Sequence, residues 1–478
     1  MYDAIIIGAG VVGAMCARSF TMQGMKVCIT EKESDVAMGA TKANSAIVHA
    51  GFDATEGSLK AKLNVKGSQM MEDICLKLGV KYQNNGSVVV GFNEEDLNHI
   101  KELKKRGDAN GVKGLEVLMG EEVFKKEPGL SKNVTSALWA PTGAIVCPYD
   151  LTVAAIGNAM DNGADLKTNF HVKSICEKDG VYTVSNGEES IQANIVINAA
   201  GIYSDYVASL IGDCSFTVHP RKGEYILLDK PKKLPVKATV FRTPTKMGKG
   251  ILVTPTVDGN VLLGPTSVDM EDKDDTSTQS EGFKKILSQA TENVDGLSLN
   301  KSITSFCGLR AAGSTGDFII TSPRKGFINL GGIESPGLSA SPAIAEYVLE
   351  MLTGQGFKFE PKKDFNPIRK SMHFFREMNI DEKNSVIKKD PAYGKIVCRC
   401  EGVTEGEILY AIRQNPRPTD LDGIKRRTRA QMGRCQGGFC MPYVAELLSK
   451  ETGVSMENIT KSGKNSRIIT GFAKEGLK

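Results

Sequence analysis

The sequence predicts an α/β protein with a Rossmann-like unit at its N-terminus, a β-rich middle region and a small helical module at its C-terminus. Residues 3–7 form a short apolar run that is typical of a buried parallel strand. They lead directly into Gly8-Ala9-Gly10-Val11-Val12-Gly13 and a helical stretch over 11–23. The C-terminal region holds four of the eleven cysteines as two tight pairs, which sets it apart from the rest of the chain.

The first glycine segment has the context of a dinucleotide-binding fingerprint. The G-x-G-x-x-G pattern follows a strand and opens a helix, and a second strand over 27–30 ends at Glu31, near the spacing of about 20 residues that the motif requires. The glycines permit a tight turn, the helix N-terminus faces a pyrophosphate, and a carboxylate accepts hydrogen bonds from ribose hydroxyls. We therefore predict dinucleotide binding, with a purely structural turn as the alternative.

Beyond Glu31 the chain does not continue as alternating strands and helices. Asp258-Gly259 predicts a hairpin turn. Two strands are expected within 175–197, and residues 354–391, rich in Lys, Pro and Asp, are expected to form a linker. Thr404 followed by Glu407 predicts a capping box for a helix that runs to about residue 413. Further expected helices are 58–78, 94–105, 150–162, 337–353 and 440–448, and further expected strands are 87–91, 216–228, 239–242, 250–256, 260–264, 301–312 and 326–331.

The paired cysteines are Cys398-Arg399-Cys400 and Cys435-Gln436-Gly437-Gly438-Phe439-Cys440. Four thiolates at this spacing favour a [2Fe-2S] cluster over zinc, which is usually held by C-x2-C or C-x4-C pairs. Zinc and unliganded thiols remain alternatives. The two adjacent glycines allow backbone N–H groups to approach cluster sulfurs. The other cysteines are interpreted as small core residues: Cys16, Cys28, Cys75, Cys147, Cys176, Cys214 and Cys307.

Composition narrows the function class. The 478 residues are 41% hydrophobic and 24% charged, which predicts a soluble globular protein of roughly two to four domains. A net charge of +4 argues against general nucleic-acid binding. No apolar run reaches membrane-span length, no signal peptide is expected, and the odd cysteine count favours the cytoplasm. The acidic run 269–275 is expected to be a solvated loop. A basic group is expected to offset cluster charge or to dock an acidic partner: Lys425, Arg426, Arg427, Arg429 and Arg434.

Three glycine-rich segments, 8–13, 198–201 and 331–337, resemble in order and separation the D-amino-acid-oxidase-like FAD superfamily. Residues 42–51 and 57–61, together with Arg221-Lys222-Gly223-Glu224-Tyr225 and Gly308-Leu309-Arg310, resemble its branch that holds anaerobic glycerol-3-phosphate dehydrogenase and L-2-hydroxyglutarate dehydrogenase. The C-R-C-E and C-Q-G-G-F-C motifs resemble the bacterioferritin-associated-ferredoxin-type [2Fe-2S] domain.

The resemblance implies an α/β FAD-binding Rossmann-like domain with an interleaved α+β substrate domain, plus a small helical C-terminal [2Fe-2S] domain. The oxidoreductase part is expected to span 1–353. Its FAD-binding pieces are about 1–80, 150–212 and 305–353, and its substrate-domain pieces are about 81–149 and 213–304. The linker over 354–391, the cluster domain over 392–460 and a tail over 461–478 complete the chain.

The resemblance also implies site residues. The expected cluster ligands are Cys398, Cys400, Cys435 and Cys440. Arg310 and His49 are the catalytic candidates, and Arg310, Arg221 and Lys222 the anion-binding ones. A structural salt bridge at Arg310, exposed loop cations at 221 and 222, and a packing role for His49 remain alternatives. The expected FAD contacts are Gly8, Gly10, Val12, Gly13, Glu31, Lys32, Thr41, Asn44, Ser45, Ala200, Gly201, Gly332, Ser335, Gly337 and Leu338.

The expected function is an FAD-dependent dehydrogenase that oxidises sn-glycerol 3-phosphate to dihydroxyacetone phosphate. Electrons are expected to leave singly through the [2Fe-2S] cluster to a redox partner, either a second flavoprotein or a membrane-anchoring subunit. The alternatives are an L-2-hydroxy acid or amino-acid dehydrogenase, or a non-catalytic electron-transfer subunit. The expected location is the cytoplasm, with attachment to the inner membrane face only through a partner; the oligomeric state stays open.

Overall fold

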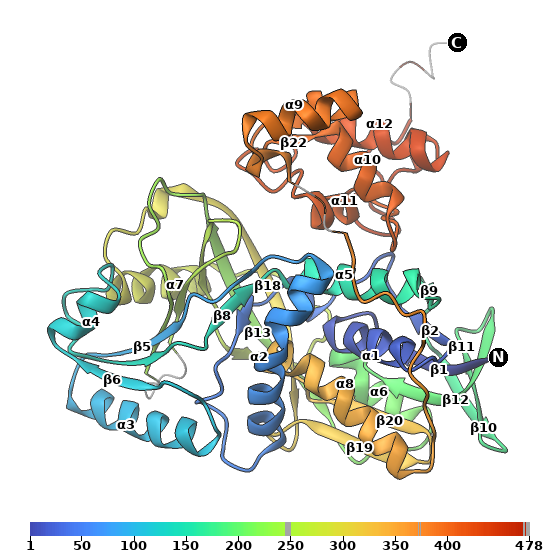
Figure 1. Cartoon of the computed structure of the whole chain (residues 1–478), viewed down its shortest axis with the longest axis horizontal. Helices are drawn as coiled ribbons and strands as arrows, with labels where there is room; N and C mark the ends of the chain where they lie inside the picture. Colours follow the sequence, from blue (N-terminus) through green and yellow to red (C-terminus); the bar gives the residue numbers. More distant parts are fainter. Residues whose placement is uncertain (244–249, 371, 373, 472–473, 475–478) are drawn as a thin grey trace.

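The computed structural model describes residues 1–243, 250–370, 372, 374–471 and 474. Figure 1 shows a body of two sheet-containing parts, one around β1 and β12 and the other around β5 and β13, with the helical C-terminal module standing above them. No helix in these described ranges is both long and apolar enough to cross a membrane.

The first part is built on an eight-stranded sheet whose centre is parallel. The strand order is β10-β11-β12-β1-β2-β9, with β20 beside the C-terminal half of β12 and β19 beside β20. The parallel strands are β1 (Tyr2–Ile7), β2 (Val27–Thr30), β9 (Asp165–Lys167), β12 (Ser190–Asn198) and β20 (Phe327–Gly331). The antiparallel strands are β10 (Ser174–Lys178), β11 (Val181–Ser185) and β19 (Ile319–Arg324).

Helices α1 (Val11–Met22), α2 (Leu59–Leu78), α5 (Pro148–Asp161) and α8 (Gly337–Gly354) pack together beside this sheet. Their apolar side chains share one core with the sheet, including Ile6, Phe20, Ile29, Ile197 and Ile344. The short helix α6 (Ser204–Ser209) contacts β12 and β20. Strands from near both ends of the region over 1–353 therefore meet in one domain.

The second part contains a nine-stranded sheet in the order β17-β13-β16-β15-β14-β5-β7-β6, with β18 beside β13. A small sheet pairs β3 (Ile47–Val48) and β4 (Tyr82–Gln83) with β8 (Ala144–Val146). The large-sheet strands are β5 (Ser87–Gly91), β6 (Glu116–Met119), β7 (Ser136–Ala140), β13 (Val218–Leu228), β14 (Thr239–Arg242), β15 (Leu252–Pro255), β16 (Val261–Gly264), β17 (Val268–Asp269) and β18 (Ser302–Gly313). The accompanying helices are α3 (Glu94–Ala109), α4 (Glu121–Lys126) and α7 (Ser280–Asn293). The predicted interleaving of two domains is confirmed.

The C-terminal module has its own apolar core, which contains Cys398, Ile408, Ile424, Val444 and Leu448. The capping box predicted at Thr404 and Glu407 is confirmed. Its elements are β21 (Ile396–Cys398), β22 (Val403–Thr404), α10 (Glu405–Arg413), α11 (Leu421–Thr428) and α12 (Met441–Thr452).

The structure differs from the sequence expectation in several elements. The expectation of two strands within 175–197 is wrong, because Asp179-Gly180 turns the chain with positive φ angles between β10 and β11 and β12 then returns beside β11. The region expected as a linker contains helix α9 (Ile380–Lys389), which begins with a capping box formed by Asn379 and Glu382. Further elements were not expected: helices α4, α6, α7 and α11, and strands β4, β6, β7, β8, β9, β17, β19, β21 and β22.

Gly67 provides a test of how α2 packs on α8. A Cβ atom at Gly67 would lie 2.3 Å from the Ser339 carbonyl oxygen, which belongs to the α8 backbone. We predict that Gly67→Ala lowers the urea midpoint of unfolding, because overpacking costs roughly 1–3 kcal/mol and exceeds the gain in helix propensity of about 1 kcal/mol. Gly354→Ala is the control, since a Cβ atom at this helical glycine meets no atom within 4 Å. Equal midpoints for the two variants would contradict this description of the contact.

Candidate cofactor and substrate site

The three glycine-rich segments meet at one edge of the parallel sheet. They follow β1, β12 and β20, which are neighbours with their carboxyl ends at the same edge. Gly8 has a φ of 106°, and a Cβ atom there would lie 2.4 Å from the Ala199 carbonyl oxygen, so Ala200 and Gly201 come directly beside the first glycine turn. The sequence candidates Gly8, Ala200 and Gly201 are therefore brought together.

Glu31 and Thr41 are joined to the same turn. Glu31 Oε2 accepts a 2.9 Å hydrogen bond from the Ala9 N–H, and Thr41 Oγ1 accepts a 3.1 Å bond from the Val11 N–H at the start of α1. Burial raises the pKa of the Glu31 carboxyl. The N-cap residue of α1, Gly10, has no side-chain acceptor, so the N–H groups of Val12 and Gly13 in the first turn are suited to binding an anionic group.

The other expected FAD contacts fall into two groups. The Lys32 ammonium lies 4.2 Å from the centre of the Tyr203 ring, on the exposed side of the β2 end. Asn44 donates to the carbonyl oxygens of Ala40 and Thr41 and accepts from the Ala46 N–H, and thus shapes the loop that precedes β3. Asn44 consequently orders its neighbours Thr41 and Ser45.

His49 lies beside the third glycine segment. Its backbone N–H donates a 2.7 Å bond to Ser339 Oγ, and its Nε2 lies 3.3 Å from Ser335 Oγ. Gly337 is the first residue of α8, and Leu338 packs against the core of the first domain. Gly332 has a φ of 60° and approaches Gly313 closely. The imidazole is therefore held at the start of α8.

Arg310 and Arg221 lie directly opposite each other on the paired strands β18 and β13. Arg221 Nε bonds Asp269 at 2.7 Å, whereas Arg310 Nη2 donates only to the Thr266 carbonyl oxygen at 3.3 Å. Among the residues that the structure describes, no carboxylate pairs with Arg310. A half-buried guanidinium without a carboxylate is suited to binding an anionic ligand.

Two glycines on the face that carries Arg310 allow neighbouring groups to approach closely. A Cβ atom at Gly223 would lie 3.0 Å from Arg310 Nη2, and one at Gly308 would lie 1.9 Å from the Ala43 carbonyl oxygen. Tyr225 stacks on Phe306 on this face, and its hydroxyl lies 3.4 Å from Ser45 Oγ. The loop over 40–45 thus packs directly on the strands that carry Arg310 and Arg221.

Lys222 is not brought together with Arg310. Consecutive strand residues point to opposite faces, and the Lys222 side chain, only 4% exposed, bonds Asp275 at 2.9 Å and Ser277 at 3.1 Å. The acidic run expected as a solvated loop is largely exposed, but it also contains the partners of two basic residues, Arg221 and Lys222. Lys273, within the run, pairs with Asp205.

Sequence reasoning missed several residues at this site. Ser339 receives the His49 N–H, and Glu334 lies 3.6 Å from Arg221 and 2.9 Å from Lys60. Both depend on how α8 and its preceding loop pack on distant segments, so no local pattern marks them. Gly223 and Gly308 stood within recognised motifs, but only the structure shows that Arg310 and Ala43 approach them closely.

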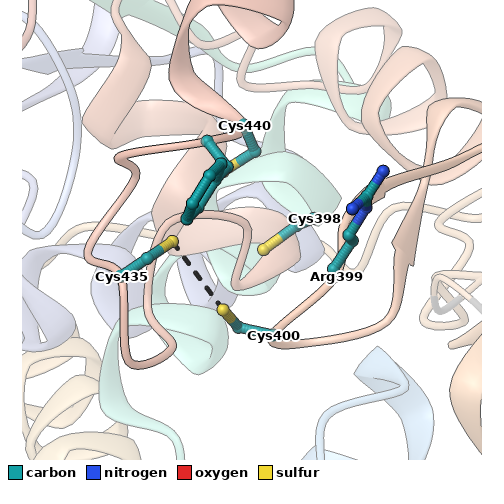
Figure 2. A pocket seen from close by; sticks show the side chains of 6 residues that line it. Cys398, Arg399, Cys400, Cys435 and Cys440 are labelled. Carbon is teal, nitrogen blue, oxygen red and sulfur yellow. Dashed lines mark hydrogen bonds between the residues drawn. The ribbon is translucent and has the colours of Figure 1, made fainter.

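The four C-terminal cysteines surround a cavity of about 190 Å³ that is also lined by Arg399 and Phe439. In Figure 2 the sulfurs of Cys398, Cys400 and Cys435 point into a common space, while the Arg399 guanidinium points away. The sulfurs of Cys400 and Cys435 are 3.7 Å apart (Figure 2), close to the separation of two thiolates on one tetrahedral metal with bonds of about 2.3 Å.

The environment favours the thiolate form at two of the four sulfurs, Cys435 and Cys398, whereas the neighbouring cysteines and burial raise the pKa of the Cys400 and Cys440 thiols. Backbone N–H groups of Phe439 and Gly437 bond Cys435 and lower the pKa of its thiol. A hydrogen bond from Cys440 lowers the pKa of Cys398 to about 6. In the described ranges no three His, Cys, Asp or Glu side chains converge tightly enough for a single ion. Four sulfurs spread around a cavity therefore fit a two-iron cluster better than one zinc ion.

Comparisons with known proteins agree with both parts of the site. Residues 3–351 match the family model described as FAD dependent oxidoreductase, and residues 396–450 match the BFD-like [2Fe-2S] binding domain. The expected cofactors, FAD and a [2Fe-2S] cluster, and the expected fold class are confirmed.

Three relatives illustrate the similarity. A glycerol 3-phosphate dehydrogenase of Caloramator mitchellensis is 44% identical over 99% of both chains. The solved structure of a reduced L-α-glycerophosphate oxidase of Mycoplasma pneumoniae with FAD bound has a TM-score of 0.74 and 31% identity, and covers 78% of this chain and 99% of its own. A mitochondrial L-2-hydroxyglutarate dehydrogenase of Bos taurus is 32% identical over 56% of this chain and 61% of its own.

Gly433 tests the cluster cavity. A Cβ atom at this position would lie 2.3 Å from the Cys400 Cβ, so Gly433→Ala must displace a cluster ligand. We predict that purified wild-type protein holds about two irons and two labile sulfides per chain, and that Gly433→Ala retains FAD but loses most of both. Gly394→Ala is the control, because its Cβ would make only an ordinary 3.4 Å contact with Ile387. Full iron and sulfide content in Gly433→Ala would refute the assigned cavity.

Proposed function

The chain belongs to the FAD-dependent oxidoreductase family, and from this premise we propose that it oxidises sn-glycerol 3-phosphate to dihydroxyacetone phosphate. The observation that carries the proposal is the Arg310 guanidinium, which has no carboxylate partner among the described residues and lies beside Gly223, where a Cβ atom would come within 3.0 Å of its Nη2. The substrate named for the relative that matches 99% of the chain supports the same conclusion.

The residues divide the work as follows. Arg310 binds the substrate phosphate through the two-point geometry of its guanidinium, and Arg221, directly opposite, adds positive charge. His49 accepts the proton of the C2 hydroxyl, and its bond with Ser335 orients the imidazole. When bound, FAD supplies the acceptor for the hydride from C2, and the cluster carries electrons singly.

The glycine turns are proposed to hold the FAD. The first turn of α1 receives the pyrophosphate, and Glu31 accepts from the adenosine ribose. The N-terminus of α8 at Gly337 points its partial positive charge toward the flavin ring. Thr41, Asn44 and Ser45 border the flavin from the loop before β3.

We propose that electrons leave through the C-terminal module to a redox partner, which is a second flavoprotein or a membrane-anchoring subunit. Phe439 lines the cluster cavity and is 85% exposed, and Cys400 is exposed beside it. These two residues provide an apolar and electronically close contact for a docking protein. In this proposal the protein works in the cytoplasm and meets a membrane only through its partner.

A second candidate substrate is an L-2-hydroxy acid. The L-2-hydroxyglutarate dehydrogenase relative supports it, and its carboxylate would also pair with Arg310. An amino acid is a further variant of this alternative. A non-catalytic electron-transfer subunit has no use for an anion-binding arginine, so the presence of Arg310 and His49 in the chain counts against it.

The deciding experiment is anaerobic reduction of the bound flavin by candidate substrates, which is measured as the loss of the visible flavin absorbance. Glycerol 3-phosphate should bleach the flavin, whereas glycerol should be a very poor substrate because it leaves the cationic site unpaired. Bleaching by L-2-hydroxyglutarate alone would replace the named substrate, and no bleaching by any of these compounds or by amino acids would support a non-catalytic role.

Arg310→Lys separates charge from geometry. We predict that kcat/KM for glycerol 3-phosphate falls roughly 10- to 1000-fold, about 1.4–4 kcal/mol of transition-state stabilisation, because lysine keeps the charge but loses the planar fork. Arg324→Lys is the matched control, since Arg324 on β19 also donates to a single backbone carbonyl, that of Ile211. Similar kinetics for the two variants would exclude Arg310 from anion recognition.

A further inference from the structure

The C-terminal module is docked on the body through buried charges, and one contact lies on the loop after β2. Helix α11 of the module contacts α5 of the body (Figure 1). Residues of this region reach Ser34 and Asp35, which follow Glu31 closely in sequence. Ser34 Oγ donates a 2.8 Å bond to Asp420, and Thr419 Oγ1 donates to the Ser34 carbonyl oxygen at 3.2 Å.

Asp35 is held by two arginines of α11. Arg427 grips both carboxylate oxygens at 2.8 Å, and Arg426 Nη2 bonds Oδ2 at 2.6 Å. The three side chains are only 3–6% exposed. Burial would raise the pKa of the Asp35 carboxyl, but the charges of Arg427 and Arg426 outweigh it and lower the pKa to about 2. The pair is therefore fully charged and shielded from solvent at neutral pH.

The same loop is tied to the glycine turn on its other side. The Ala37 N–H donates to the Ala9 carbonyl oxygen at 3.0 Å, and the Ala9 N–H donates to Glu31. Val36 and Ala37 are completely buried. A continuous series of short contacts thus runs from α11 through Asp35 and Ala37 to the turn that is proposed to receive the FAD pyrophosphate.

We propose that Asp35 is a positioning residue for FAD, and that Arg426 and Arg427 of the cluster module hold it in place. Docking of the module fixes the loop over 34–37, and this loop in turn orients Ala9 and Glu31. The inference rests on FAD binding at the first glycine turn and is independent of the substrate. Because coupling is reciprocal, bound FAD must also favour the docked position of the module.

A second interface contact offers a matched control. Asp258, on the hairpin between β15 and β16, is also a buried carboxylate that bonds cations of the C-terminal region, Arg429 and Arg376, each at 2.8 Å. Lys81 lies 3.3 Å away. This network joins the module to the substrate domain and does not include the loop after β2. Asp258→Asn removes a comparable charge without touching that loop.

The first measurement is the FAD dissociation constant, obtained from the fluorescence of released flavin, for the full-length protein with its cluster in place. Asp35→Asn and Arg427→Lys should each weaken FAD binding, by about tenfold for the former and less for the latter, which keeps the charge but cannot grip both oxygens. Asp258→Asn should stay near wild type. Glu31→Ala serves as the positive control. The visible circular dichroism of the cluster verifies that the C-terminal module of each variant is folded.

The second measurement is hydrogen exchange of the α11 amides with and without FAD. In the wild type, FAD removal should increase exchange in α11; in Asp35→Asn the increase should already be present and FAD should have no further effect. If Asp35 has a purely structural role, α11 exchange in Asp35→Asn will still depend on FAD, and this result would overturn the proposal. Equal weakening of FAD binding by Asp35→Asn and Asp258→Asn would overturn it as well, because it would indicate general undocking.

Discussion

The parallel pairing of β20, β12 and β1 is the constraint on which the rest of the molecule depends. These strands come from residues 2–7, 190–198 and 327–331, yet they lie side by side in register, with Ile7 opposite Asn198 and Asn198 opposite Asn329. A buried hydrogen bond of 2.8 Å between the two asparagine side chains supports this register. Because parallel strands end at the same edge, three distant glycine segments form a single cofactor surface.

The pairing of β13 with β18 performs the equivalent task on the side proposed to bind substrate. Strand alternation places Arg221, Gly223 and Tyr225 on one face opposite Arg310, Gly308 and Phe306, and sends Lys222 to the other face. The loop that carries Thr41 and Ser45 closes on this face at Gly308. One short loop consequently joins the surfaces proposed to bind cofactor and substrate, and Asn44 maintains the conformation of this loop.

The third part is attached to the body through buried ion pairs. Arg426, Arg427 and Arg429, expected to offset cluster charge or to dock an acidic partner, instead form buried ion pairs with Asp35 and Asp258 of the body. Arg434 remains exposed and pairs with Asp229. Buried ion pairs require strict geometry and disfavour misaligned docking, so this interface defines one position of the module.

Local patterns in the sequence determined much of this protein. The strand–glycine–helix unit at 3–23, the position of Glu31, the capping box at Thr404 and Glu407, and the two cysteine pairs each depend on neighbours within one element or turn. Such signals are legible because propensity, capping and ligand spacing act over a few residues. The family resemblance added the interleaving of the domains.

The contacts between residues that are distant in sequence were decided only by the tertiary structure. It separated Lys222 from Arg310, placed Ser339 and Ser335 against His49, and turned basic residues of α11 toward Asp35, which lies almost 400 residues earlier in the chain. It also revealed helix α9 within a polar segment whose composition is typical of a linker. The physical reason is that a buried charge or hydroxyl is stable only beside a partner, and which partner it meets depends on how distant elements pack, not on its neighbours in sequence.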